Sequence, residues 1–400
     1  MTAAPWTPAF LASRRGQRFA WGLMALLVVV VTLLVALQPG RRTVTPTYHA
    51  ASRSWWAGRE LYHGGTWGYL YPPQFAILFT PFAAAPSPLG DVLWRWVNLG
   101  LFISALARLA RLPGGEGRPP LLALITVLSI PACLSSARSG QVNMTEAGLL
   151  IHAAVDIARA QWWRASLVLA VAVFLKPVGL AMALLAAAIW GKLRPRFALA
   201  ALALLVLPFA AGSVPYVIQQ YQALFWKWSL SVTPSDPFCD LGGLLTKLGI
   251  ALSERVLMAV RACAALAMLG LAAASSRRRP TDPREDGSAH RLRTALLVLA
   301  LGVTYATVFN PRTETNGYVM LAPAVAVFAG LVWQVPGERR AFWLLVAIAL
   351  GLGADNYPFY RQTDFWLKPL LGLLFFAYLA RRTLGSAQAV LSEGAGTAAR

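Results

Sequence analysis

The chain has 400 residues, of which 57% are hydrophobic and only 13% are charged, whereas about 25% of residues are charged in a soluble domain. Its apolar residues form repeated runs of about 15–20, long enough to cross the hydrocarbon core of a membrane, which excludes a soluble globular protein. The net charge of +20 does not indicate a nucleic-acid partner, because the basic residues gather in short loops between apolar runs. The three cysteines have no CxxC or His-rich spacing, so we expect neither a metal nor another cofactor.

The first apolar run, 19–38, follows three arginines and is too long for a signal-peptide core, so we expect a retained transmembrane helix. The later runs predict about ten to twelve spanning or nearly spanning helices in total. Their expected ranges are 19–38, 91–110, 119–137, 141–159, 163–175, 177–191, 196–212, 252–274, 293–309, 318–334, 340–355 and 366–381. Partial helices are expected at 46–57 and 73–85. The sequence therefore predicts an all-α polytopic membrane protein with a single transmembrane domain over 1–400.

The loops between these runs differ in charge. With the N-terminus in the cytoplasm, the arginine-rich loops all fall on the inner side, so both termini are expected to be cytoplasmic, in a bacterial plasma membrane. The segment 275–292 then forms a cytoplasmic linker, and 384–400 forms a flexible C-terminal tail. The opposite face carries two long loops, 39–90 and 213–251, rich in Trp, Tyr and Pro. We therefore expect the active face outside.

The first outer loop begins with a helix signal, Thr45 as N-cap followed by Pro46. A helix from this point places His49 and Glu60 on one face, unless Gly58 ends it early. Both side chains could then face a site beneath the outer partial helices. The alternative is an amphipathic helix that lies in the headgroup layer and has no further role.

Polar groups interrupt the apolar runs at two later places. The stretch "SGQVNMTE" at 139–146 opens a helix with Gln141 and Asn143 at its outer end, and Lys176-Pro177 divides a long apolar stretch. A cation beside a helix break in a membrane is costly unless it is paired or hydrated, which makes Lys176 a functional candidate. Its alternative role is simply to reach the membrane surface with its ammonium group.

A third polar stretch, "NPRTETNGY" at 310–318, lies between two apolar runs. Asn-Pro and Asn-Gly are turn signals, but a turn requires neither Arg312 nor Glu314. We interpret the stretch as a polar lining in which Arg312 contacts phosphate. Its other members, Glu314, Asn316 and Tyr318, are expected to contact a sugar or an acceptor. A salt-bridged turn that ties two helices together is the alternative.

In this order, these pieces resemble glycosyltransferase family 87, membrane enzymes of the GT-C class that use polyprenyl-phosphate sugars. The residues that carry the resemblance are Tyr48; Gly58, Glu60 and Tyr62 of "GRELY"; Tyr71, Pro72 and Pro73; Gly140, Gln141 and Asn143 of "GQVN"; and Lys176 and Pro177. The resemblance covers about residues 40–195. It implies a GT-C-like bundle with outer-face juxtamembrane helices, a polyprenyl-phosphate mannose donor, and a glycolipid or glycan acceptor on the outer face. It also implies that the matched Tyr, Gln, Asn and Lys side chains bind donor or acceptor.

One departure concerns the catalytic base. Members of that family carry an aspartate, the expected base, a few residues before the tyrosine matched by Tyr48, but here "RRTVTPTY" contains no carboxylate. Either another residue supplies the base, or the chemistry differs, or the activity is lost. Displacement of a lipid phosphate requires a carboxylate or imidazole for the acceptor proton and cations for the leaving phosphate. Because Glu60 lies in the loop that carries the family's base, we prefer it to Glu314 and His49.

Arg312 and Lys176 are the candidates for the phosphate, since a guanidinium offers a planar fork of donors and an ammonium a point charge. Two functions of other kinds remain open: a lipid or glycan transporter or flippase, and a catalytically inactive relative. A transporter predicts polar residues along a path open to both sides, whereas this sequence concentrates them on one side.

Overall fold

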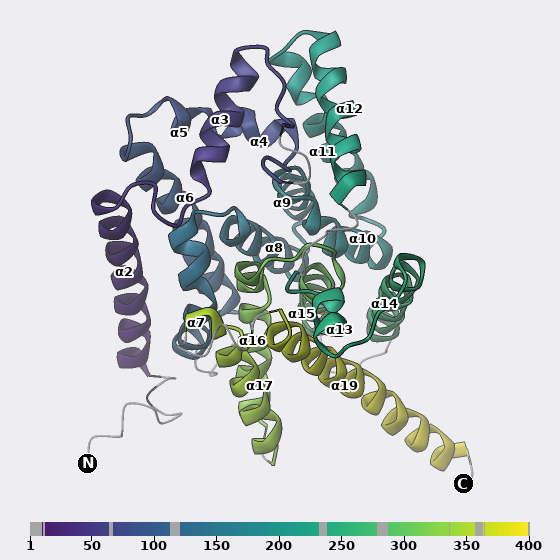
Figure 1. Ribbon diagram of the computed structural model, residues 1–400. Coiled ribbons are helices and arrows are strands. Elements are labelled where there is room, and N and C mark those ends of the chain that lie inside the picture. The colour runs from purple at the N-terminus through teal and green to yellow at the C-terminus, as the bar shows by residue number, and fades with distance from the viewer. Residues whose placement is uncertain are drawn as a thin grey trace.

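The computed structural model describes residues 10, 13–63, 67–112, 121–231, 238–277, 287–335, 337–356, 363 and 365–398. All regular elements in these ranges are helices (Figure 1). The first half of the chain contains α2 (Arg14–Leu37), α3 (Thr45–Trp56), α4 (Pro73–Leu78), α5 (Thr80–Ala84), α6 (Leu89–Leu109), α7 (Leu122–Ser139), α8 (Asn143–Ala158), α9 (Trp162–Leu175), η1 (Pro177–Gly179), α10 (Leu180–Ile189) and α11 (Arg194–Val206). The second half contains η2 (Leu207–Ala210), α12 (Val214–Ser231), α13 (Leu241–Lys247), α14 (Glu254–Arg277), α15 (Gly287–Thr304), η3 (Tyr305–Phe309), η4 (Thr315–Met320), α16 (Ala322–Trp333), α17 (Arg339–Gly351), η5 (Ala354–Asn356) and α19 (Leu367–Ala398).

Six helical segments in the described ranges are long and apolar enough to cross a membrane. They are Arg14–Leu37, Leu89–Leu109, Leu122–Ser139, Glu254–Arg277, Gly287–Phe309 and Thr315–Trp333. The all-α polytopic architecture is thereby confirmed. Fewer segments reach this length than the sequence led us to expect, because breaks divide the middle of the chain into shorter helices. The backbone becomes extended at Lys176 and at Trp190, and α11 tightens into a 3-10 turn that contains Pro208.

The centre of the bundle consists of α8, α15 and α16, whose side chains are mostly buried. Helix α8 packs against α6, α9 and α15, whereas α16 packs against α7 and α17. Glycines permit some of these close approaches: a Cβ on Gly302 of α15 would lie 2.6 Å from the Cβ of Met182 in α10. In Figure 1, α3, α4 and α12 lie at one end of the bundle, and α17 and the end of α19 lie at the other.

Residues 39–90 build the end of the bundle that contains α3. This helix packs against α4 and α5, and the ring of Tyr48 is held edge-on by four aromatic side chains. The partners are Tyr71, Phe75, Phe79 and Trp94, with ring centroids 4.8 to 6.4 Å from that of Tyr48. Because edge-to-face pairs contribute about 0.5–1.5 kcal/mol each beyond burial, this cluster fixes α3 on the bundle.

The boundaries of α3 correct two expectations. Val44, not Thr45, is the N-cap, because Thr45 is already the first helical residue. The helix then ends at Trp56, and Gly58 follows with a φ of 65°. Glu60 therefore lies beyond the helix, not on its face, because the left-handed glycine turns the chain away.

Helices lie within the segment that we expected to be the second outer loop and extend into the one that we expected to be a flexible tail. The segment 213–251 includes α12 and α13, and α19 remains helical to Ala398, past position 384. The C-terminal segment has no proline and is rich in alanine, the strongest helix former, which favours the extension. Residues 232–237, and 278–286 of the 275–292 linker, lie outside the described residues.

Gly140 occupies a position that excludes larger residues. It caps the C-terminus of α7 with a φ of 68°, and a Cβ at this position would lie 2.5 Å from Cζ of the buried Arg95. We expect Gly140→Ala to cost about 1–2 kcal/mol for the left-handed backbone and about 1–3 kcal/mol more for displacing the guanidinium. The measurement is the melting temperature of the protein in detergent. Gly58→Ala is the matched control: its φ is 65° and nothing lies within 4 Å of its Cβ position, so equal losses in both variants would contradict the contact with Arg95.

Candidate functional site

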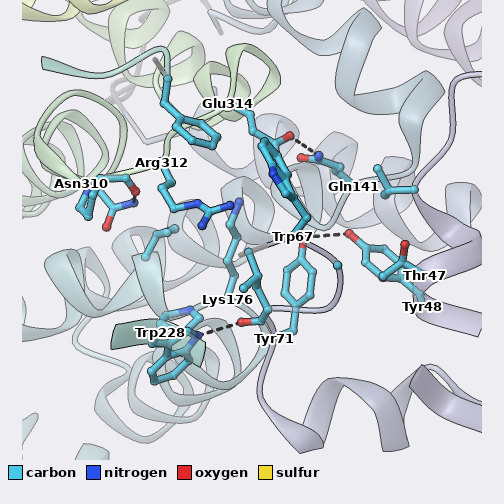
Figure 2. Close-up of a pocket in the computed structure, with 17 residues that line it drawn as sticks. Thr47, Tyr48, Trp67, Tyr71, Gln141, Lys176, Trp228, Asn310, Arg312 and Glu314 are labelled. Atoms are coloured by element: carbon cyan, nitrogen blue, oxygen red, sulfur yellow. Dashed lines mark hydrogen bonds between the residues drawn. The ribbon is translucent and has the colours of Figure 1, made fainter. Parts of the chain in front are cut away.

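A cavity of about 400 Å³ lies where the start of α3 meets segments from distant parts of the chain. Its lining comes from α3, from residues 67–71, from the helix breaks at 141 and 176–178, from α12 and Phe238, and from the turn at 310–314. Figure 2 shows that Arg312, Glu314, Gln141, Lys176, Tyr48 and Tyr71 surround one space. The three polar motifs of the sequence therefore meet in one cavity.

Glu314 is the acidic residue among the described lining residues. Its Oε2 accepts a hydrogen bond from Nε2 of Gln141, whose Oε1 accepts one from Nδ2 of Asn143 at 2.6 Å. Oδ1 of Asn143 accepts in turn from Nζ of Lys176 at 2.5 Å. A continuous chain of hydrogen bonds thus joins the carboxylate to the ammonium group and fixes the positions of both.

Arg312 contributes the second cation of the cavity. Its guanidinium carbon lies 5.2 Å from the centroid of the Trp67 ring and 5.1 Å from that of Phe238, within the range of cation–π attraction. Its backbone has a φ of 62°, an unusual value for a residue other than glycine. Asp240 accepts from the backbone N–H of Arg312 through Oδ2 at 2.9 Å and also caps α13. Asp240 therefore supports the strained conformation that directs the guanidinium into the cavity.

Two tyrosine hydroxyls line the opposite wall. The hydroxyls of Tyr48 and Tyr71 are 2.9 Å apart, and the hydroxyl of Tyr62 donates to the backbone oxygen of Tyr71 at 3.0 Å. Burial raises the pKa of the Tyr48 and Tyr71 phenols, and the negative charge of Glu314 raises both further. Both phenols therefore stay neutral at physiological pH and serve as hydrogen-bond donors or acceptors.

Most predicted site residues lie at this cavity or directly behind it. Six line it: Tyr48, Tyr71, Gln141, Lys176, Arg312 and Glu314. Four support the lining from behind: Tyr62, Asn143, Asn316 and Tyr318. Asn143 donates to Oδ1 of Asn316 at 3.1 Å, and the Tyr318 hydroxyl donates to the backbone oxygen of Cys239 at 3.0 Å.

Two predicted base candidates lie elsewhere. The side chain of Glu60 is 46% exposed, with its Oε2 3.9 Å from Nδ1 of His63, and it is not among the lining residues. His49 lies next to Tyr48 in α3 but does not line the cavity, and its Nε2 is 3.1 Å from Oδ1 of Asp91. The structure therefore brings only Glu314, of the three candidates, to the cavity.

Sequence reasoning missed the aromatic walls of the cavity, which are Trp67, Trp228 and Phe238. It also missed Asp240, which acts through the backbone of Arg312. The only signal for the aromatic residues was the general enrichment of Trp and Tyr in the outer loops. For metals, no group of three or more His, Cys, Asp or Glu side chains in the described ranges is placed to bind an ion.

Comparison with known proteins shows the family to which this chain belongs. The model of glycosyltransferase family 87 matches residues 69–301. A polyprenol-phosphate-mannose-dependent alpha-(1-2)-phosphatidylinositol mannoside mannosyltransferase of Mycobacterium tuberculosis is 26% identical over 92% of this chain and 91% of its own length. A protein of the same description from Mycolicibacterium smegmatis is 28% identical over 86% of this chain and 84% of its own. Because the family match covers more than half of the sequence, the chain belongs to glycosyltransferase family 87 and is a multi-pass membrane glycosyltransferase.

Proposed function

We propose that this chain transfers mannose from a polyprenyl-phosphate donor to a glycolipid or glycan acceptor in the cavity that Glu314, Arg312 and Lys176 line. The observation that carries the proposal is the presence of one carboxylate and two cations in the same cavity. A displacement at a sugar carbon needs a proton acceptor on the incoming side and positive charge on the leaving side. The two mycobacterial relatives are mannosyltransferases, which supports mannose as the sugar.

In the proposed reaction, Glu314 accepts the proton of an acceptor hydroxyl while the oxygen of that hydroxyl forms a bond to the anomeric carbon of mannose. The bond from that carbon to the phosphate oxygen breaks, and its electron pair leaves with the phosphate. Arg312 and Lys176 stabilise the negative charge that gathers on the leaving group, the arginine through two parallel hydrogen bonds. The products are the glycosylated acceptor and polyprenyl phosphate.

Glu314 replaces Glu60 as our preferred base. Glu60 lies outside the lining, whereas Glu314 lines the cavity and the hydrogen bond from Gln141 holds one of its oxygens in place. The other oxygen, Oε1, remains as the one that would take the proton. The missing aspartate before Tyr48 is therefore compatible with an active enzyme that takes its base from a different segment.

The aromatic and apolar part of the lining supports lipid-linked substrates. Trp67, Trp228 and Phe238 provide flat apolar surfaces beside the cations, and sugar rings and isoprenoid chains both pack on such surfaces. Both relatives are phosphatidylinositol mannoside mannosyltransferases, and we propose an acceptor of the same kind, a mannose-bearing glycolipid.

We further propose that this cavity opens to the outer face of a bacterial plasma membrane and that both termini are cytoplasmic. The arginine-rich loops support this orientation through the positive-inside pattern. In a variant without Cys133, Cys239 and Cys263, a single cysteine at Ser253 should react with an impermeant thiol reagent on intact cells, and one at Ser288 should not. Both positions are exposed in the structure, and labelling at Ser288 alone would reverse the orientation.

The activity itself is tested by incubating membranes that contain the protein with radiolabelled polyprenyl-phosphate mannose. The proposal predicts a new labelled glycolipid that is absent from membranes without the protein. A transporter or flippase would instead move the intact labelled donor across the membrane without forming a product, and an inactive relative would do neither.

A further inference from the structure

A second cavity, of about 440 Å³, lies among α14, α15, α16 and α19. Its lining includes Arg293 of α15, Phe328 of α16, and Tyr378 and Arg382 of α19, together with Gln334, which follows α16. None of its lining residues is shared with the cavity that contains Glu314. It therefore needs a separate explanation.

The two cavities lie at opposite ends of the same helices. The second is lined by residues 293–297 near the start of α15, whereas residues 310–314, which follow its continuation in η3, line the first. A separation of about 13 residues at 1.5 Å rise per residue corresponds to roughly 20 Å. The hydrocarbon core of a bilayer is about 30 Å thick, so the second cavity lies toward the leaflet opposite the proposed active site.

The lining of the second cavity combines an apolar wall with basic and polar groups. Leu296, Leu297 and Leu331 form part of the wall, beside the Phe328 ring. Nε2 of Gln334 is shielded from solvent and has no hydrogen-bond partner among the described residues. Because a buried donor without an acceptor costs about 1–3 kcal/mol, this amide indicates a ligand that carries an acceptor atom.

Arg382 is held in place at this cavity. Its Nη1 donates to Oε1 of Glu338 at 2.7 Å, and its Nε donates to the hydroxyl of Tyr378 at 3.3 Å. These contacts orient the guanidinium beside Arg293, which also lines the cavity. The described lining contains two arginines and no acidic side chain, and Glu338 pairs with Arg382 from outside it.

We propose that this second cavity binds an anionic phospholipid, with acyl chains against the apolar wall and the phosphate within reach of Arg293, Arg382 and Gln334. Arginine suits this task, since its donors match phosphate oxygens in pairs. The leaflet supports the same ligand: a basic pocket between transmembrane helices on the cytoplasmic side is a known type of anionic-lipid site. The inference uses none of the residues of the proposed sugar transfer, and only its assignment to the cytoplasmic leaflet rests on the orientation proposed above.

The test measures lipid retained by the purified full-length protein in native mass spectrometry. The probes are phosphatidylglycerol and phosphatidylcholine with the same acyl chains. Both lipids offer a phosphate, but the quaternary ammonium of phosphatidylcholine brings a positive charge close to the arginines, so we expect phosphatidylglycerol to bind about tenfold more tightly. Equal retention of the two lipids would overturn the proposal. The proposal would also be overturned if inorganic phosphate alone protected the protein against thermal unfolding as much as phosphatidylglycerol does.

Three variants separate a lipid contact from a structural ion pair. Arg382→Gln should abolish most of the preference for phosphatidylglycerol, whereas Arg381→Gln, the matched loss of one charge outside the lining, should retain it. Glu338→Gln removes the partner of Arg382 and a negative charge, so it should preserve or increase the preference. If Glu338→Gln and Arg382→Gln reduced lipid retention equally, the pair would be structural and the proposed site would be wrong.

Discussion

Glu314→Gln is expected to lower the rate of mannosyl transfer by about 10²–10⁴-fold, the usual effect of losing a general base. The substitution removes the proton acceptor but keeps a carbonyl oxygen that can accept the hydrogen bond from Gln141. Donor binding should therefore change little. The measurement is single-turnover transfer from radiolabelled polyprenyl-phosphate mannose by the purified enzyme in liposomes, with donor affinity determined separately.

Glu60→Gln is the matched control for this prediction, since it makes the same chemical change at an exposed position outside the cavity. We expect its turnover to stay close to that of the wild type. If Glu60→Gln lost activity and Glu314→Gln kept it, the base would lie in the first outer segment, as the position of the family's aspartate would suggest.

Arg312→Lys is expected to lower transfer by about 10²-fold, as loss of a group that stabilises developing charge does. Lysine keeps the positive charge but cannot form two parallel hydrogen bonds to a phosphate, and it does not reproduce the contacts of the guanidinium with the Trp67 and Phe238 rings. The left-handed backbone at this position is equally strained for both residues, so folding should be affected little. Transfer rates over a range of donor concentrations provide the measurement.

Arg53→Lys serves as the control, because Arg53 is an exposed residue of α3 that does not line the cavity. Arg312→Ala should reduce donor use further, since it removes the charge as well. Wild-type donor turnover in correctly inserted Arg312→Ala protein would exclude a role for this side chain at the phosphate.

The sequence was sufficient to predict the helical membrane architecture, because hydrophobic length and loop charge act locally along the chain. It was less informative about the short helices. The breaks at Lys176 and Trp190 were visible as a Lys-Pro pair and as the glycine that follows Trp190, Gly191. Helix α12, by contrast, was missed, because the segment between residues 213 and 251 is too polar to resemble a membrane span.

The site was predictable in its parts but not in its assembly. Local patterns singled out Gln141, Lys176 and Arg312 because polar groups among apolar runs are costly. The hydrogen bond from Gln141 to Glu314, however, joins residues 173 positions apart, and no local pattern reveals such a contact. For Glu60, the early end of α3 that Gly58 offered as an alternative is the one observed, and it leaves that carboxylate outside the cavity that contains Glu314.

The most direct test of the central claim is the position of the donor phosphate in an electron cryo-microscopy structure. The Glu314→Gln variant, which should bind donor without turning it over, would be imaged in nanodiscs with polyprenyl-phosphate mannose. We expect the phosphate within hydrogen-bond distance of Arg312 and Lys176, with the anomeric carbon on the side of residue 314. A phosphate bound outside this cavity, or against Glu60 and His63, would contradict the account.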